Sequence, residues 1–176
     1  MTHEILIAGF GGQGILFAGK LLAYAAMLED KYVSWLPSYG PEMRGGTANC
    51  SVIISDEPVS SPIIVNPTTL MVMNLPSLEK FEDAVVSGGH ILIDSSLIDK
   101  EVERDDVKSF PIPSTKMADD MQAGKLANMV LLGKLIKETG VLPFESILNA
   151  LKKTVPAKKA DMLEINKKAL EAGYNA

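Results

Sequence analysis

The glycine-rich run Gly-Phe-Gly-Gly-Gln-Gly at residues 9–14 constrains the fold more than any other stretch of this chain. The apolar run "HEILIAG" leads into it, and the long apolar run "QGILFAGKLLAYAAMLED" leads out of it. The first is typical of a buried parallel strand, and the second of a helix packed into an interior. Glycines at this spacing let the backbone turn tightly and approach an anion, which the helix N-terminus can bind. The run therefore predicts a strand–turn–helix unit that serves either as an anion-binding loop or as a tight packing turn.

Strand-like and helix-like runs continue to alternate along the 176 residues. Further strands are expected at residues 31–36, 47–55, 69–74, 90–94 and, at a sheet edge because of two prolines, 105–113. Helices are expected at residues 76–85, in one long segment at 115–140, and in the C-terminal part at about 143–174. The pattern predicts a single domain, residues 1–176, with a three-layer α/β/α sandwich around a mostly parallel or mixed sheet.

Composition excludes several classes of protein. A net charge of −5 leaves no basic stripe to neutralise nucleic-acid phosphates. The single cysteine, Cys50, excludes an internal disulfide or a protein-ligated iron–sulfur cluster and fits a reducing compartment. No apolar run approaches the roughly 18 residues of a membrane span, and the start "MTHEILIAGFGG" lacks the basic region of a signal peptide. We therefore expect a cytoplasmic protein that binds neither nucleic acid nor a membrane.

The sequence lacks the second feature of a nicotinamide or flavin dinucleotide site. Such sites place an acidic residue at the end of the second strand, where it binds the ribose. Leu36 and Pro37 stand at that point, and Glu29 and Asp30 come before the strand. A triphosphate-binding P-loop is also disfavoured, because no hydroxyl residue follows Lys20.

Isolated polar residues offer little further chemistry. His3 and His90 each begin a strand and have no second ligand at metal spacing, so we predict no metal site. Asp94 ends a strand and is expected to cap the turn that follows, while Cys50 is expected to be a buried hydrophobic residue. Asn128 lies within an apolar helical run and needs a hydrogen-bond partner, either in the core or on a ligand. No catalytic set of residues emerges.

The run "SYGPEMRGG" (Ser38–Gly46) is too rich in glycine and proline for a regular element. It contains Arg44, the only cation between Lys31 and Lys80. One interpretation is a surface turn; the other is an arginine presented to an anion or to a partner's carboxylate, which its planar group suits. The run should follow the second strand at its carboxyl end, as the glycine loop follows the first. Both loops would then face one ligand crevice.

Three segments together resemble the gamma subunit of 2-oxoacid:ferredoxin oxidoreductases. They are "GFGGQGILFAGKLLAYAA", "SYGPEMRGGTANCSVIIS" and "KLANMVLLG", and the resemblance extends over essentially the whole chain. The second segment is most similar to the 2-oxoglutarate or 2-ketoisovalerate branch. An indolepyruvate oxidoreductase subunit and a stand-alone nucleotide- or CoA-binding module are the alternatives.

The resemblance implies a subunit of a larger enzyme. Such complexes decarboxylate a 2-oxoacid on thiamine diphosphate, release an acyl-CoA and reduce ferredoxin through iron–sulfur clusters. Thiamine diphosphate, its Mg²⁺ and the clusters would belong to alpha and beta subunits and to a ferredoxin-like delta subunit. This chain would shape the entrance by which coenzyme A (CoA) reaches the active site. The residues implied near CoA are Gly9, Gly11, Gly12, Gln13 and Gly14 in the glycine loop, Tyr39, Glu42, Arg44, Gly45 and Gly46 in the facing loop, and Asn128.

Overall fold

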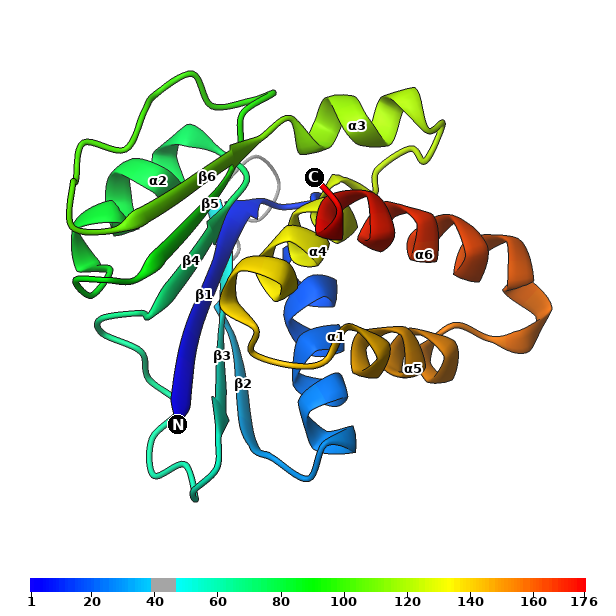
Figure 1. Cartoon of the computed structure of the whole chain (residues 1–176), viewed down its shortest axis with the longest axis horizontal. Coiled ribbons are helices and arrows are strands. Elements are labelled where there is room, and N and C mark those ends of the chain that lie inside the picture. The colour runs from blue at the N-terminus through cyan, green and yellow to red at the C-terminus, as the bar shows by residue number, and fades with distance from the viewer. Residues whose placement is uncertain (39–46) are drawn as a thin grey trace.

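A six-stranded mixed sheet forms the centre of the computed structural model, which describes residues 1–38 and 47–176 (Figure 1). The strand order is β2-β3-β1-β4-β5-β6. The parallel strands are β1, β4, β5 and β6, whereas β3 runs antiparallel to both β1 and β2. Their bounds are β1 Thr2–Phe10, β2 Tyr32–Ser38, β3 Thr47–Ser55, β4 Thr69–Val72, β5 His90–Asp94 and β6 Lys108–Ile112.

Helices cover the sheet unequally on its two faces (Figure 1). One face carries α1 (Ile15–Leu28), α4 (Ala127–Thr139), α5 (Phe144–Thr154) and α6 (Ala160–Tyr174). The other carries α2 (Leu75–Phe81), which continues into the short 3-10 helix η1 (Glu82–Ala84). A second 3-10 helix, η2 (Ala157–Lys159), precedes α6. The predicted α/β architecture with a mixed sheet is confirmed. None of the described helices is both long and apolar enough to cross a bilayer.

Strand β1 lies at the centre of the core because apolar residues occupy both of its faces. Ile5 and Ile7 belong to the larger apolar cluster under α1, α4 and α5. Leu6 and Ala8 belong to the smaller cluster under α2. Alternate residues of a strand point to opposite faces, so one strand supplies both clusters. This anchors the start of the glycine turn in the most buried part of the sheet.

The expected single helix at residues 115–140 is wrong. The structure has two helices there, α3 (Ser114–Asp120) and α4, separated by residues 121–126. Gln122 (φ 53°) and Gly124 (φ 57°) adopt left-handed conformations, which end a right-handed helix. Apolar residues recur on both sides of the break, so hydrophobic periodicity alone could not reveal it.

Helices α4 and α6 approach to direct backbone contact. A Cβ atom on Gly173 would lie 1.7 Å from the Val130 carbonyl oxygen, and one on Gly133 would lie 2.1 Å from the Leu170 carbonyl oxygen. Only glycine fits at these crossings. The contact fixes the C-terminal helix against α4, whose N-terminus adjoins the glycine turn.

Candidate functional site

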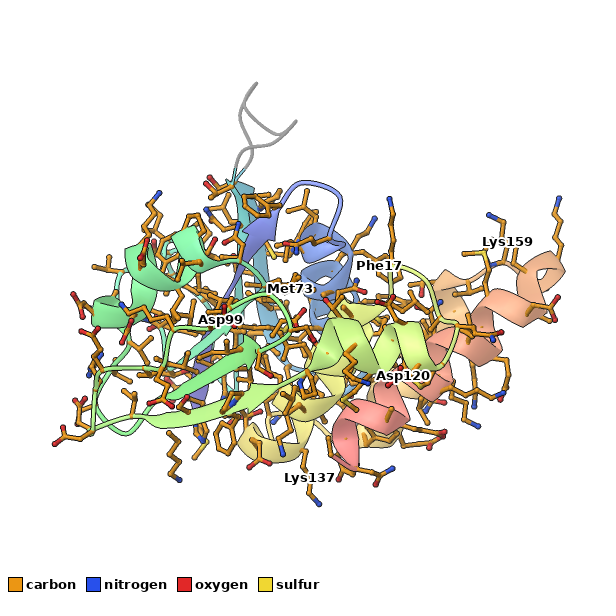
Figure 2. The ribbon with its side chains drawn as sticks, turned by 90° about the horizontal axis from the view of Figure 1, so that it is seen from above. Phe17, Met73, Asp99, Asp120, Lys137 and Lys159 are labelled. Carbon is orange, nitrogen blue, oxygen red and sulfur yellow. The ribbon has the colours of Figure 1, made fainter. Side chains whose placement is uncertain are left out.

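A crevice of about 360 Å³ lies where the glycine turn leaves the carboxyl end of β1. We call it the glycine-turn crevice. In an open α/β sheet, ligands bind at this edge of the parallel strands. Met73, immediately after β4, forms part of its wall and is labelled in Figure 2. The complete lining is Gly11, Gly12, Gln13, Met73, Leu97, Thr115, Asp119, Gly124, Lys125 and Ala127.

Gly12 is the open point of the glycine turn. Its φ is +92°, and a Cβ atom built on it would meet no described atom within 4 Å. Its side-chain position therefore faces the free space of the crevice. The first turn of α1 follows at once, with backbone N–H groups that have no acceptor within the helix and a positive dipole end. The turn can thus accept an anion close to its backbone.

Gly9 and Gln13 hold the turn in shape. The side-chain oxygen of Gln13 accepts a hydrogen bond from the Phe10 N–H (2.6 Å), and its Nε2 donates to the Met73 carbonyl (3.0 Å). The amide therefore links the carboxyl ends of β1 and β4. A Cβ atom on Gly9 would lie 2.5 Å from Gln13 Oε1 and 2.8 Å from Ile15 Cδ1. Gly9 is required for this packing, and the two polar atoms of Gln13 are engaged within the chain.

Asn128 connects α4 to the glycine turn. Its side chain is only 3% exposed, and its Nδ2 donates a hydrogen bond of 3.0 Å to the Gly14 carbonyl. Gly14 has φ +76°, and a Cβ atom there would lie 2.3 Å from that Nδ2. Of the two expected roles, the core hydrogen bond is the one observed. Asn128 Oδ1 has no partner within residues 1–38 and 47–176.

Lys125 is the site residue that sequence reasoning missed. It lines the crevice together with Asp119, so the wall carries one cation and one acid. The expected continuous helix at 115–140 hid it as one more lysine on a helix surface. The signal that could have found it is the Gly124–Lys125 pair directly before an apolar helix. Gly124 is in the left-handed conformation that places Lys125 at the N-terminal end of α4.

Asp94 is a structural cap, as predicted. The carboxylate is fully buried and accepts hydrogen bonds from the Ser96 N–H (3.1 Å) and the Thr115 N–H (3.3 Å). The Thr115 hydroxyl donates to it as well. These bonds tie the end of β5 to the start of α3, and so they position the α3 side of the crevice.

The cysteine and the two histidines lie away from the crevice. Cys50 is completely buried, as predicted, and burial raises the pKa of its thiol to about 12. His3 and His90 lie at the amino ends of β1 and β5, and partial burial lowers the pKa of both imidazoles. His90 stacks on Phe110 with ring centroids 6.0 Å apart. Within the described ranges, no group of three or more His, Cys, Asp or Glu is placed to hold a metal ion.

The candidate residues of the second loop, Tyr39, Glu42, Arg44, Gly45 and Gly46, lie outside the described residues. The strand ends on either side of them are described. Ser38 pairs with Asn49, and Thr47 pairs with Phe10, the residue before the glycine turn. The ends of β2 and β3 thus lie at the same sheet edge as the glycine turn, as expected.

Comparison with known proteins places the whole chain in one family. The family model described as pyruvate ferredoxin/flavodoxin oxidoreductase matches residues 4–176. The 2-oxoglutarate synthase subunit KorC of Methanocaldococcus jannaschii is 38% identical over 89% of this chain and 85% of its own length. The ketoisovalerate oxidoreductase subunit VorA of Methanothermobacter marburgensis is 40% identical over 97% of this chain. The chain spans only 35% of that VorA sequence.

Solved structures agree with this assignment. The keto/oxoacid ferredoxin oxidoreductase gamma subunit of Geobacter sulfurreducens superposes with a TM-score of 0.84 and 30% identity, over 98% of this chain and 96% of its own. A 2-oxoglutarate:ferredoxin oxidoreductase from Magnetococcus marinus gives a TM-score of 0.89 at 24% identity, over 99% of this chain and 30% of its own. The second likeness establishes the fold alone. The resemblance found in the sequence is confirmed, and the chain belongs to the pyruvate ferredoxin/flavodoxin oxidoreductase family.

Proposed function

We propose that this chain is the gamma subunit of a 2-oxoacid:ferredoxin oxidoreductase and that its glycine-turn crevice receives part of CoA. The observation that carries the proposal is the open backbone at Gly12. It adjoins the N-terminus of α1, and Lys125 stands on the same crevice wall. A helix N-terminus and an ammonium group are both suited to phosphate oxygens. A crevice of about 360 Å³ suits one part of a long ligand, with the remainder lying toward a partner subunit.

The redox chemistry belongs to partner subunits in this proposal. When bound to those partners, thiamine diphosphate would stabilise the carbanion left by decarboxylation, and the clusters would accept the electrons. The one cysteine of this chain is buried with a raised thiol pKa, so it is poorly suited to ligate a cluster. The contribution of this chain is to bind and orient CoA. Gln13 and Asn128 keep the turn in its shape, and the absence of a side chain at Gly12 keeps the approach open.

The second loop is proposed to form the facing wall of the entrance. This part of the proposal rests on the resemblance, which assigns Tyr39, Glu42, Arg44, Gly45 and Gly46 to it. Arg44 would contact CoA or a partner's carboxylate. Arg44→Ala in the assembled complex should lower CoA-dependent activity without affecting assembly. Unchanged activity would remove Arg44 from the entrance.

We propose 2-oxoglutarate as the substrate of the complex, with 2-ketoisovalerate as the second candidate. Relatives with either name are similar to this chain at nearly equal identity, 38% for KorC and 40% for VorA. The two acids differ at the end remote from the reacting carbonyl, which is a carboxylate in one and a branched alkyl group in the other. A cationic pocket in a partner subunit would select the first and an apolar pocket the second.

The test is reconstitution with the thiamine-binding chains of the same organism. The purified complex should reduce ferredoxin or a viologen dye only when a 2-oxoacid and CoA are both present. A panel of 2-oxoglutarate, 2-ketoisovalerate, pyruvate and indolepyruvate then identifies the substrate by kcat/KM. If the chain binds CoA tightly alone and assembles with none of the thiamine-binding chains, the stand-alone module replaces this proposal.

A further inference from the structure

Helix α1 exposes an apolar face that its composition does not explain. Lys20 is its only charged residue, and a helix that is apolar on nearly all sides is normally buried. In the structure one side of α1 packs on the sheet, while Phe17 is 41% exposed and Met27 59% exposed (Figure 2 labels Phe17). Exposed apolar residues that gather on one face mark an interaction surface.

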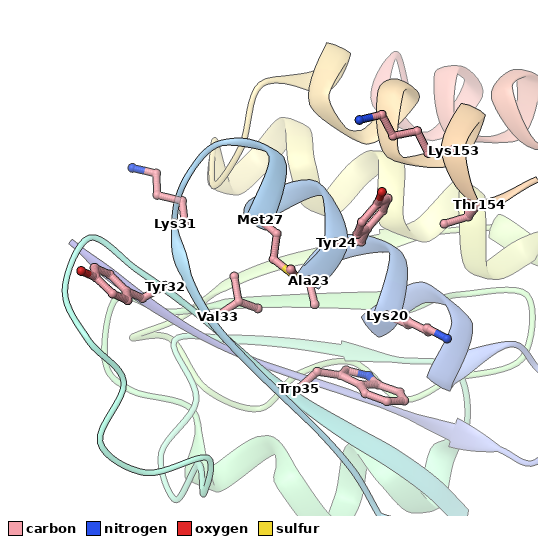
Figure 3. A pocket seen from close by; sticks show the side chains of 10 residues that line it. All are labelled: Lys20, Ala23, Tyr24, Met27, Lys31, Tyr32, Val33, Trp35, Lys153 and Thr154. Carbon is pink, nitrogen blue, oxygen red and sulfur yellow. The ribbon is translucent and has the colours of Figure 1, made fainter.

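A groove of about 620 Å³ runs beside this face (Figure 3). We call it the α1–β2 groove. Its wall includes Tyr24 and Met27 from α1, Tyr32 and Trp35 from β2, and Lys153 near the end of α5. Tyr32 is 49% exposed and Trp35 is 37% exposed. Aromatic residues and methionine are the side chains enriched in the buried centres of protein interfaces.

The groove also follows an edge of the sheet. β2 is the first strand in the order β2-β3-β1-β4-β5-β6, and it pairs on one side with β3. On its other side, the described part of the chain supplies no neighbouring strand. Such an edge offers backbone N–H and C=O groups to another chain. Pro37 within β2 removes one donor, so an occupant would rely chiefly on side chains.

The charges of the groove indicate the chemistry of its occupant. Lys20, Lys31 and Lys153 line it, and the described lining contains no acidic residue. Lys31 forms an ion pair with Asp56, while no described acid pairs with Lys20 or Lys153. This local excess of cations contrasts with the chain's net charge of −5. The complementary surface is apolar at its centre and carboxylate-bearing at its rim.

We propose that a partner subunit of the oxidoreductase covers the α1–β2 groove with an apolar segment whose carboxylates pair with Lys20 and Lys153. The inference rests on the proposed function and adds the surface through which the chain is held. The matched region is only 35% of the VorA chain, so in that relative the same unit is joined to a longer polypeptide. A second copy of this chain fits less well, because a two-fold contact through this face would bring lysines against lysines.

Charge reversal tests the proposal in the reconstituted complex. Lys20→Glu with Lys153→Glu should weaken association with the partner chains at least tenfold, measured by titration and analytical ultracentrifugation. The control is Lys108→Glu with Lys158→Glu, two exposed lysines at β6 and η2 that carry the same change of charge outside the groove. The control should stay within twofold of wild type. Added salt should weaken the wild type more than the Lys20→Glu, Lys153→Glu variant.

Oxidative footprinting provides a second readout that needs no variant. Met27 and Met162 are both exposed in the free chain, at 59% and 47%, and should both be oxidised readily. In the complex, oxidation of Met27 should slow at least tenfold relative to Met162 on α6.

Three results would overturn the inference while leaving the proposed function intact. They are wild-type association by the charge-reversed variant, unchanged oxidation of Met27 in an active complex, and protection of Met27 in a free dimer of this chain. If the wild-type chain associates with no thiamine-binding partner at all, the proposed function fails, and this inference fails with it.

Discussion

Gly12→Ala separates the role of the glycine turn in ligand binding from its role in folding. Gly12 has φ +92°, where a residue with a Cβ atom is strained by about 1–2 kcal/mol. The added methyl group meets no described atom within 4 Å, so no clash adds to that strain. For a chain of this length, such a loss lowers the melting temperature by about 2–8 °C. The variant should therefore fold, with a methyl group projecting into the glycine-turn crevice.

Gly88→Ala is the matched control. Gly88 has φ +78°, and its added Cβ atom also meets nothing within 4 Å. It lies in the turn before β5, at the amino end of the strand, whereas the crevice lies at the carboxyl ends. The two variants should lose similar stability in thermal unfolding. Any difference between them in the assembled complex then reflects the crevice.

The expected difference is in the KM for CoA. A hydrogen bond from a backbone amide to a charged group contributes about 1.5–3 kcal/mol, and about 1.4 kcal/mol corresponds to a factor of ten. Gly12→Ala should therefore raise the KM for CoA about tenfold or more, and Gly12→Val should raise it further. Gly88→Ala should leave it within twofold. A KM that is unchanged in Gly12→Ala, or raised equally in both, would refute the reasoning and leave the glycine run as a packing turn.

Three further outcomes concern packing and burial. Gly173→Ala should lower stability by at least about 2 kcal/mol in urea unfolding, because its methyl group would overlap the Val130 carbonyl; an unchanged midpoint would show that α4 and α6 separate easily. Asn128→Ala should cost about 1–3 kcal/mol by removing the donor to the Gly14 carbonyl, and a neutral result would make that hydrogen bond dispensable. Burial raises the Cys50 thiol pKa from its ordinary 9.0 to about 12, so only the unfolded thiol ionises between these values. Stability should fall as the pH rises through that window, and thiol labelling at pH 8 should require unfolding; rapid labelling of the folded chain would contradict this.

The strand–turn–helix unit could be predicted because its signals are local. The apolar run before Gly9 fixes a buried strand, and the glycines that follow have the freedom the turn needs. The edge strand at residues 108–112 was also predictable, since proline is tolerated at a sheet edge. In each case the residues that determine the structure lie within a few positions of one another.

The parts that could not be predicted depend on distant residues or on one backbone conformation. The partner of Asn128 is the carbonyl of Gly14, 114 positions away. The two hydrogen bonds of Gln13 include one to Met73, 60 positions away. The break after α3 depends on left-handed conformations at residues 122 and 124, which the apolar pattern masks. Missing that break also concealed Lys125.

Helix α1 joins the two proposed sites and gives them a physical connection. Its first turn forms the anion-binding end of the glycine turn, and its outer face forms one wall of the α1–β2 groove. The helix begins at Ile15 and is fixed at that end by Asn128 and Gln13, so a partner seated on the outer face would restrain the same rigid element. A subunit held through α1 would therefore keep the glycine turn in register with the active site of the partner. This explains why a chain with no catalytic set of its own carries an almost uncharged helix directly behind its most open glycine.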